Sequence, residues 1–403
     1  MKNVAVIAEY NPFHTGHAYH IRKVREEFGQ DTTVIAFMSG TFVQRGDIAV
    51  ADKWVRAEAA VQGGADLVLE IPFPYSAAGA EFYATAAVRL ILSVGGIDVL
   101  SFGSEVGDAD ALLRMAEHMQ SDDYIFALKD ALKDRSKDGF PASAEAVYRS
   151  VFPEENTEDF FRPNNILAIE YLKALSRENA SVVSHTVKRV GAAYADDTLP
   201  TQGYPSATSL RKLLLAGDPS ALSYMPKEVA QVYREAILRG ICPADAERLS
   251  PAVLSFFRLN PTPQNPDIRD AAGGLYTRLA KKSREATGIS SLATLSETKK
   301  YTNARIRRAM WFSFFGVTSS EVSAPPTYTQ VLALNGRGQA FLKAAKRTAK
   351  IPILTKPSAI DELTPEAIPG KRFSDAADEV AESAMPKPRA ATALLRHTPF
   401  LKK

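Results

Sequence analysis

The sequence predicts an α/β domain built on a parallel sheet, followed by a mostly helical second domain. Within the first hundred residues, short and almost entirely apolar strands alternate with longer segments whose apolar residues recur at helical spacing. Strands of this composition are buried on both faces, which is typical of parallel sheets covered by helices. The chain of 403 residues is longer than one core usually supports. Because the pattern becomes mostly helical near residue 220, we expect two domains, 1–220 and 221–403.

Strands and helices alternate in the predicted first domain. Strands are expected at residues 4–8, 33–38, 67–71 and 99–102, and helices between them at 18–28, 54–62 and 80–92. Glycine pairs follow the second and third of these helices and end them. Ligands of open α/β sheets bind at the carboxyl ends of the strands. The segments after the first, second and fourth strands are therefore the candidate site.

The pattern is less regular further along the chain. Residues 108–150 look helical and charged, as in an insertion. A helix at 166–175 follows Asn164 and Asn165; we expect one to cap this helix and the other to reach a ligand. A strand at 181–187 and a loop at 196–205 precede a helix that begins at Ser206. In the helical half, residues 329–334, 339–346 and 351–354 have the pattern of a small βαβ unit, and the stretch from Pro365 is expected to be helical or loosely attached.

Composition excludes several classes of protein. The single cysteine, Cys242, allows no intramolecular disulfide and no cysteine-based metal cluster. No segment approaches the roughly 18 consecutive apolar residues of a membrane span, and the first residues lack the apolar stretch of a signal peptide. We therefore expect a cytoplasmic protein with no membrane partner. The formal net charge of +3 is too small to indicate a partner by itself.

The strongest functional pattern is the HTGH motif, residues 14–17, directly after the first strand. The amides and dipole at a helix N-terminus attract phosphate. His14 and His17 are three positions apart, so both imidazoles fall on one face and can donate to the same anion. Gly16 has no Cβ and lets the backbone approach a ligand closely. The motif thus predicts a phosphate-binding turn.

A second helix start, at Ser206, carries two hydroxyl groups and a cation. Ser206 and Thr208 are candidate hydrogen-bond donors to phosphate, and Arg211 is a candidate for neutralising the β,γ end of a nucleotide. Two other interpretations of the histidines stay open. They can be structural, or they can bind a metal, for which the nearby ligands are Glu9 and, more distantly, Asp47 or Asp52.

Longer segments of the chain resemble a known family. The motif with residues 206–211 is similar to the HxGH nucleotidyltransferase superfamily, relatives of the class I aminoacyl-tRNA synthetases, which implies a Rossmann-like catalytic domain. More specifically, the chain resembles the tRNA(Met) cytidine acetate ligase family, and this likeness is dense over 1–212. It is carried by residues 9–20, 38–40, 44–47, 53–54, 102–105, 163–167 and 188–189, and more thinly by the basic stretch 299–308.

This resemblance implies an ATP-dependent ligase. The enzyme would activate acetate as acetyl-adenylate and acetylate N4 of the wobble cytidine of elongator tRNA(Met), with His14, His17 and Arg211 as catalytic residues. ATP would enter with Mg²⁺ bound to its phosphates; no protein metal site is predicted, because no carboxylate pair is evident. The residues expected to contact ATP are Ile7, Ala8, Glu9, Tyr10, Asn11, Pro12, Phe13, His14, Thr15, Gly16, His17, Ala18, Tyr19, His20, Gly103, Asn164, Arg189, Ser206 and Thr208.

The basic helical half is the candidate tRNA surface. Cations beside an aromatic residue, here Tyr301, suit phosphate contact and base stacking. The candidate tRNA-binding residues are Lys299, Lys300, Arg305, Arg307 and Arg308. A further charged group, Arg45, Asp47, Lys53 and Arg56, is interpreted either as binding acetate, nucleotide or tRNA, or as a solvated face.

Two other functions remain open for this sequence. One is a small-molecule adenylyltransferase of the same fold, and the other is a non-catalytic protein that binds nucleotide or tRNA. No general base for the cytidine amine is evident in the sequence, and the oligomeric state is not predicted.

Overall fold

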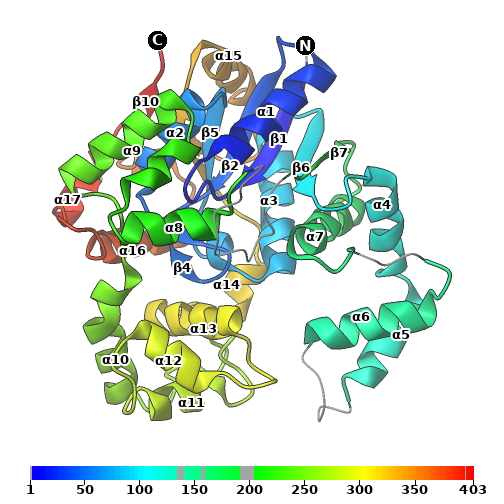
Figure 1. The fold of residues 1–403 in the computed structure, drawn as a ribbon, viewed down its shortest axis with the longest axis vertical. Coiled ribbons are helices and arrows are strands. Elements are labelled where there is room, and N and C mark those ends of the chain that lie inside the picture. The colour runs from blue at the N-terminus through cyan, green and yellow to red at the C-terminus, as the bar shows by residue number, and fades with distance from the viewer. Residues whose placement is uncertain (1, 134–139, 156–158, 191–203, 395) are drawn as a thin grey trace.

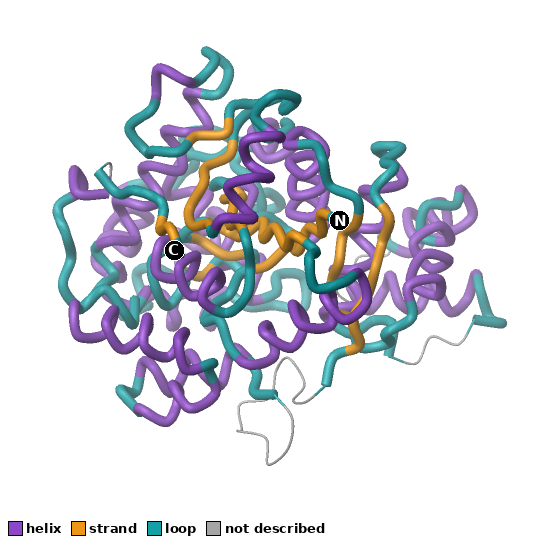
Figure 2. Tube along the Cα trace, turned by 90° about the horizontal axis from the view of Figure 1, so that it is seen from above, coloured by secondary structure: helices purple, strands orange, loops and turns teal. Residues whose placement is uncertain are grey.

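A single mixed sheet lies at the centre of the molecule (Figures 1 and 2). The computed structural model describes residues 2–133, 140–155, 159–190, 204–394 and 396–403. The strand order is β10-β8-β5-β2-β1-β6-β7, with β9 beside β8. Five neighbouring strands are parallel, which confirms the predicted α/β fold. They are β1 (Asn3–Ala8), β2 (Thr33–Ser39), β5 (Leu67–Ile71), β6 (Val99–Ser104) and β7 (Val183–Lys188).

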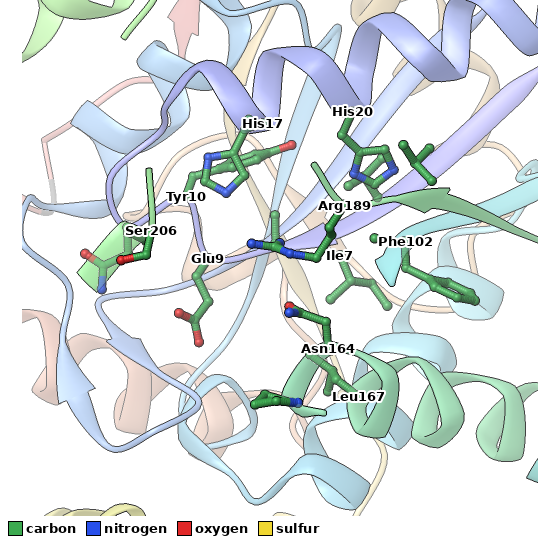
Figure 3. Close-up of a pocket in the computed structure, with 18 of the residues that line it drawn as sticks. Ile7, Glu9, Tyr10, His17, His20, Phe102, Asn164, Leu167, Arg189 and Ser206 are labelled. Carbon is green, nitrogen blue, oxygen red and sulfur yellow. The ribbon is translucent and has the colours of Figure 1, made fainter. Parts of the chain in front are cut away.

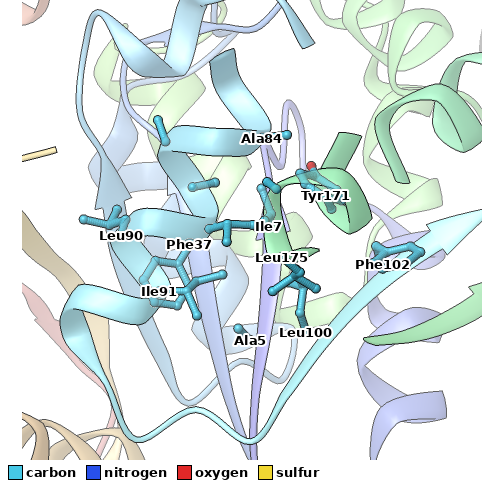
Figure 4. Packing of buried hydrophobic residues seen from close by; sticks show 14 of the residues in the cluster. Ala5, Ile7, Phe37, Ala84, Leu90, Ile91, Leu100, Phe102, Tyr171 and Leu175 are labelled. Carbon is cyan, nitrogen blue, oxygen red and sulfur yellow. The ribbon is translucent and has the colours of Figure 1, made fainter. Parts of the chain in front are cut away.

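Successive residues of β1 belong to two cores, one on each face of the sheet. Ala5 and Ile7 pack in the core that contains α3 (Ala80–Val94) and α7 (Pro163–Arg177), shown in Figure 4. Val4 and Val6 pack in the opposite core, with α1 (Thr15–Phe28), α2 (Lys53–Gln62) and α9 (Lys227–Arg239). Adjacent side chains of a strand point to opposite faces, so a continuous apolar run supplies both cores.

The strand order reverses at β1. The chain passes from β1 to β2 and β5 on one side and then returns to β6 and β7 on the other. In open α/β sheets, such a reversal leaves a crevice at the carboxyl ends of the strands. Helix α1 begins at this edge, with His14 as its N-cap. The HTGH motif therefore lies where the alternating pattern predicts a ligand.

Strands from the last quarter of the chain return to the same sheet. β8 (Thr329–Leu334) pairs antiparallel with β5, and β10 (Phe400–Leu401) pairs parallel with β8. The predicted βαβ unit is present as β8, α15 (Gly336–Ala345) and β9 (Ile353–Leu354), with β9 parallel to β8. The unit extends the central sheet instead of standing within the helical half. The division at residue 220 stays a prediction.

The helical lobe, residues 246–323, packs against a small hairpin formed by β3 (Phe42–Val43) and β4 (Asp47–Ile48). Its elements are η3 (Ala246–Leu249), α10 (Ser250–Leu259), α11 (Leu275–Lys282), α12 (Ile289–Ser296), α13 (Asn303–Phe315) and α14 (Ser319–Ser323). Trp311 meets Phe42 edge to face, with ring centroids 5.0 Å apart. In Figure 1 the lobe lies below the sheet, across from the arm of α5 (Asp122–Ala131) and α6 (Phe140–Val151).

The arm and the last residues complete the fold. The arm follows α4 (Ala109–His118), and its residues 134–139 lie outside the described part, as does the predicted loop up to residue 203. The short elements are α8 (Ala207–Leu215), η1 (Tyr75–Ala77), η2 (Pro219–Tyr224), η4 (Ile360–Glu362) and α17 (Ala391–Leu394). Over the residues that the structure describes, no helix has both the length and the apolarity to cross a bilayer.

Of the two alternatives predicted for the stretch from Pro365, helical or loosely attached, the structure shows the first. α16 (Ile368–Glu382) is a helix, as its pattern predicts, and the Asp378 carboxylate lies 2.7 Å from the Lys53 Nζ. Further on, Arg389 pairs with Asp52 at 2.7 Å. These ion pairs join the C-terminal residues to the N-cap and the first residue of α2. Sequence patterns do not predict partners so distant along the chain.

Candidate active site

A pocket of about 460 Å³ opens at the carboxyl edge of the sheet. Its wall combines the segment after β1, the ends of β6 and β7, and the first turns of α1, α7 and α8 (Figure 3). Most residues expected to contact ATP lie on this wall: Ile7, Ala8, Glu9, Tyr10, Asn11, His14, Gly16, His17, Tyr19, His20, Gly103, Asn164, Arg189 and Ser206. Segments separated by up to 200 residues in the sequence therefore form one site.

Other candidates lie behind the wall: Pro12, Phe13, Thr15, Ala18, Thr208 and Arg211. Arg211 braces the HTGH turn, because its guanidinium donates to the Asn11 carbonyl at 2.8 Å and to the Thr208 Oγ1 at 3.0 Å. Ser206 lies on the wall, but its Oγ accepts the Ser209 amide at 3.0 Å as the cap of α8. In this structure the second element therefore supports the turn. Arg211 and Thr208 do not line the pocket, and their contacts with phosphate stay a prediction.

The backbone holds both motif histidines through their Nδ1 atoms. The His14 Nδ1 accepts the Gly16 amide at 3.0 Å, and the His17 Nδ1 accepts the His14 amide at 3.1 Å. A neutral imidazole has one acceptor nitrogen and one donor nitrogen, so each ring carries its proton on Nε2. The ring centroids are 3.9 Å apart. The turn thus presents two neighbouring Nε2–H donors, as required for shared contact with one anion.

Burial keeps these histidines neutral. It lowers the pKa of His14 to about 3, assisted by the positive charges of Arg189 and Arg211. Burial also lowers the pKa of His17 well below its usual value, with a further contribution from His14. At neutral pH both residues are therefore uncharged donors instead of cations. A phosphate bound beside them would raise both pKa values, because it favours the protonated form.

Gly16 has a structural role in addition to the predicted close approach to a ligand, which stays a prediction. A Cβ at this position would lie 2.8 Å from the His14 Cε1 and 3.3 Å from the Tyr204 Cβ. The absent side chain leaves room for the His14 ring to fold back over the helix start. Gly16 therefore protects the histidine cap.

The described residues do not favour a metal at this turn. Both Nδ1 atoms already accept backbone hydrogens. Within the described ranges, no group of three or more His, Cys, Asp or Glu side chains is arranged to hold a metal ion. The zinc interpretation therefore lacks the third and fourth ligands that such a site needs.

Glu105, directly after β6, caps helix α7 in place of either asparagine. Its carboxylate accepts the Asn165 amide at 2.9 Å and also binds the side-chain nitrogen of Asn164. Asn165 is fully buried, and its Oδ1 accepts the Glu105 amide at 2.8 Å. One hydrogen of the Asn164 side-chain nitrogen is engaged by Glu105, and its amide oxygen is available to a ligand. Asn164 can therefore accept a hydrogen bond from a ribose hydroxyl or a base amine.

The far end of the pocket has an apolar wall around Arg189. In Figure 3 Arg189 lies near the centre, between the helix of His20 and Asn164, with Phe102 and Leu167 beyond it. The His20 Nε2 lies 2.8 Å from the Ser101 Oγ, which anchors its ring. Phe102 and Leu167 were not predicted as site residues, because apolar residues on a strand or helix are usually core. Their position at an element end next to polar candidates was the available signal.

Two cations after the second strand are structural, which contradicts their interpretation as ligand contacts or a solvated face. Arg56 is completely buried and donates to the carbonyls of Ala51, Glu9, Ser39 and Gly40. Lys53 is buried between Glu70 and Asp378, with Nζ–O distances of 2.8 and 2.7 Å. Of this group only Arg45 lies on the pocket wall.

The basic stretch 299–308 is divided between exposed and engaged cations. Lys299 and Lys300 are exposed, and the Lys300 Nζ also donates to the Gly273 carbonyl at 3.0 Å. Arg307 pairs with Asp47 at 2.7 Å, and Arg308 pairs with Asp270 at 2.6 Å with both side chains 13% exposed. Arg305 donates to the Asp270 carbonyl at 3.2 Å.

Tyr301 cannot be the stacking platform that the sequence suggests. Its side chain is buried, and its hydroxyl donates to the Gly273 carbonyl. The charged ends of Lys300 and Arg305 lie 5.0 and 5.3 Å from its ring centroid. The ring is therefore part of the lobe's own packing.

Comparison with known proteins gives a consistent result. Residues 1–386 match the HIGH Nucleotidyl Transferase family. The chain is 35% identical over 361 residues to a tRNA(Met) cytidine acetate ligase of Caldanaerobacter subterraneus, covering 88% of this chain and 89% of the relative. A protein of the same name from Halalkalibacterium halodurans is 33% identical over 374 residues, covering 90% and 89%.

Solved structures are similar over the whole length. The crystal structure of Thermotoga maritima TmcAL bound with alpha-thio ATP superposes with a TM-score of 0.89 at 29% identity, covering 100% of both chains. The apo form of the same protein gives a TM-score of 0.91 at 28% identity, again covering 100% of both chains. The match therefore includes the C-terminal strands and the helical lobe as well as the sheet.

Proposed function

The chain belongs to the tRNA(Met) cytidine acetate ligase family of HIGH nucleotidyl transferases, and from this we propose that it acetylates N4 of the wobble cytidine of elongator tRNA(Met), using acetate and ATP. One observation is the main support for the proposed chemistry. His14 and His17 form a pair of neutral, backbone-anchored donors on the wall of a pocket at the reversal point of the sheet. Such a pair suits an anion whose charge changes during reaction.

The first half-reaction requires positioning and charge stabilisation. A carboxylate oxygen of acetate attacks the α-phosphorus of ATP, and pyrophosphate leaves. The Nε2–H groups of His14 and His17 donate to phosphate oxygens as negative charge moves toward the leaving group. Arg189, in the middle of the pocket, supplies positive charge to the adenylate, and the Asn164 amide oxygen accepts from the ribose or the base.

Mg²⁺ is expected to enter bound to the phosphates of ATP. Among the residues known to line the pocket, Glu9 is the one carboxylate. A single carboxylate is a poor Mg²⁺ site without substrate, because Mg²⁺ takes six oxygen ligands and commonly receives several from phosphates and water. The proposal therefore assigns the protein no resident metal.

The tRNA is proposed to bind across the helical lobe, with its wobble cytidine in the pocket. Ala304 of α13 lines the pocket, so this lobe reaches the rim of the site. Lys299 and Lys300 are exposed beside α13 and, together with Arg305, stay as candidates for phosphate contact. Arg307 and Arg308 are better explained as holding the lobe, since their guanidinium groups pair with Asp47 and Asp270. Such an enzyme would act in the cytoplasm, where tRNA is found.

The decisive experiment supplies labelled acetate, ATP and total tRNA, followed by analysis of nucleosides by mass spectrometry. N4-acetylcytidine that requires both acetate and ATP is the expected result. AMP transfer to a small molecule without acetate would instead indicate a small-molecule adenylyltransferase. Binding of ATP and tRNA with no product would indicate a non-catalytic protein. Elongator tRNA(Met) and a variant lacking the wobble cytidine then test the acceptor.

A further inference from the structure

Glu9 is placed differently from the other acidic residues near the sheet edge. It follows β1 directly, lines the pocket, and is the only carboxylate in the pocket lining defined by the described residues. In Figure 3 its carboxylate points away from Phe102, into the part of the pocket that lies between Ser206 and Asn164. Gln44 and Arg45 of the hairpin lie near Glu9, and Ala304 of the helical lobe also lines the pocket.

One oxygen of this carboxylate is held, and the other is available. The Gln44 amide donates to the Glu9 Oε1 at 3.0 Å, and Arg56 fixes the Glu9 backbone by donating to its carbonyl at 2.7 Å. Among the described residues, none donates a hydrogen bond to the Oε2. A carboxylate oriented at one oxygen and open at the other has the arrangement of a proton acceptor.

The proposed reaction needs such a group in its second half. When the amine of cytidine attacks acetyl-adenylate, the new N–C bond forms and the C–O bond to the phosphate breaks. The bonding electrons leave with AMP, and the nitrogen must lose one proton. The exocyclic amine is a weak nucleophile because its lone pair is delocalised into the ring, so removal of this proton assists attack. His14 and His17 are unsuited to accept it, since their Nδ1 atoms already accept backbone hydrogens.

We propose that Glu9 is the catalytic base that accepts the N4 proton of cytidine during acetyl transfer, an assignment that rests on the function proposed above. The proton moves from N4 to the Glu9 Oε2 as the acetyl carbon is transferred, and AMP carries away the negative charge. With Glu9 as the base, the pocket has one end for the nucleotide and one end for the cytidine. Arg189 and Phe102 mark the nucleotide end, and Glu9 with Arg45 marks the acceptor end, next to the helical lobe.

The charges around Glu9 are consistent with this role. Burial raises the pKa of Glu9, while Arg211, the hydrogen bond from Gln44, Arg45 and Arg56 oppose the rise. From the remaining helices packed here, Tyr83 of α3 and Tyr171 of α7 face it, and burial raises the pKa of the Tyr83 and Tyr171 phenols, so both are neutral at physiological pH. The carboxylate form is the active one. Transfer should therefore rise as pH increases through the Glu9 pKa and fall below it.

The acceptor end is connected to the helical lobe. The Trp311 Nε1 donates to the Gly46 carbonyl at 2.9 Å, and Arg307 pairs with Asp47 in the same hairpin. Gln44, whose amide orients Glu9, lies in this hairpin as well. The lobe proposed to bind tRNA thus helps to position the residue proposed to act on its cytidine.

The test separates the two half-reactions in the full-length enzyme. Acetate-dependent ATP–pyrophosphate exchange measures adenylate formation, and single-turnover transfer from preformed acetyl-adenylate to tRNA measures the second step across pH 5.5–9. Glu9→Gln keeps an oxygen for the Gln44 amide but accepts no proton. We expect transfer to fall by about 100-fold or more, as for loss of a general base, and its pH-dependent limb to disappear. Exchange should change less than about 10-fold.

Glu58→Gln is the matched control, because burial also raises the pKa of Glu58 but this residue lies outside the pocket lining. It should keep the pH profile of the wild type. Glu9→Asp should restore part of the pH-dependent limb. Equal losses of exchange and transfer in Glu9→Gln would place Glu9 in ATP binding and overturn the proposal, as would unchanged transfer. If the wild type makes no acetylcytidine, the proposed function itself fails.

Discussion

The HTGH motif and the basic stretch 299–308 look alike as sequence patterns, since each is a short run of potential donors, but their structures differ. In the motif, the Nδ1 atoms of His14 and His17 accept amides from the same four residues, which leaves the Nε2–H groups of two pocket-lining residues as donors. In the basic stretch, Arg307 and Arg308 are paired with carboxylates from distant segments. A side-chain donor can bind a ligand only where hydrogen bonds and ion pairs within the protein do not already occupy it. In the motif, the partners of the two histidines lie within the motif itself, and their Nε2–H donors stay available.

The largest effect that tests this comparison is expected from His17→Ala. Losing one positioned donor to a developing charge costs on the order of 100- to 1,000-fold in rate, so acetate-dependent ATP–pyrophosphate exchange should fall by that amount. The affinity for tRNA should not change, because the ring faces the nucleotide pocket. His118→Ala, at the end of α4 and outside the pocket lining, serves as the control. A loss of tRNA affinity in His17→Ala would show that the motif also contacts RNA.

A smaller effect, on stability, is expected from Arg308→Ala. The pair with Asp270 is mostly buried, and removing one partner of such a pair leaves an uncompensated charge, so unfolding in urea should become easier by about 3 kcal/mol. Arg305→Ala is the matched variant, since Arg305 donates to backbone carbonyls and its loss should cost about 1 kcal/mol. If Arg308→Ala keeps full stability and mainly loses tRNA affinity, Arg308 is not structural. The contrast between the motif and the basic stretch is then wrong.

The smallest effect is expected from exposed cations of the helical lobe. Lys281, Arg284 and Lys299 are exposed, and within the described part of the chain their side chains have no hydrogen bond or ion pair. Replacing all three by Ala should weaken tRNA binding several-fold and reduce the slope of log affinity against log salt by about 2, because fewer counterions are released. Stability should stay within about 0.5 kcal/mol. An unchanged salt slope would exclude this surface from tRNA contact.

Local features of the fold and site were predictable from sequence. The apolar run at 4–8 followed by HTGH identifies a buried strand and a helix start, and β1 and α1 are found there. The reversal of strand order then brings Gly103, Asn164 and Arg189 to the same pocket. The places of these residues follow from the alternation of strands and helices, and the spacing of apolar residues in the sequence predicts that alternation.

Long-range choices were not predictable in the same way. Nothing in residues 329–334 indicates antiparallel pairing with β5, because a buried apolar strand fits either edge and either direction. Likewise, the capping of α7 by Glu105 and the burial of Arg56 depend on partners far along the chain. The sequence can therefore predict the helix or strand on which a polar side chain lies. Whether that side chain is available to a ligand can be seen only in the structure.

Arg56 has one further consequence, for the lifetime of a reactive intermediate. Its guanidinium donates to the carbonyl oxygens of Glu9, Ser39 and Gly40, where β1 and β2 end, and Glu9 itself lines the pocket. Buried carbonyls without such a donor would recruit ordered water. A mixed anhydride such as acetyl-adenylate is destroyed by water. A protein donor at the carbonyl of the lining residue Glu9 takes the place of one such water and removes one source of hydrolysis before the cytidine binds.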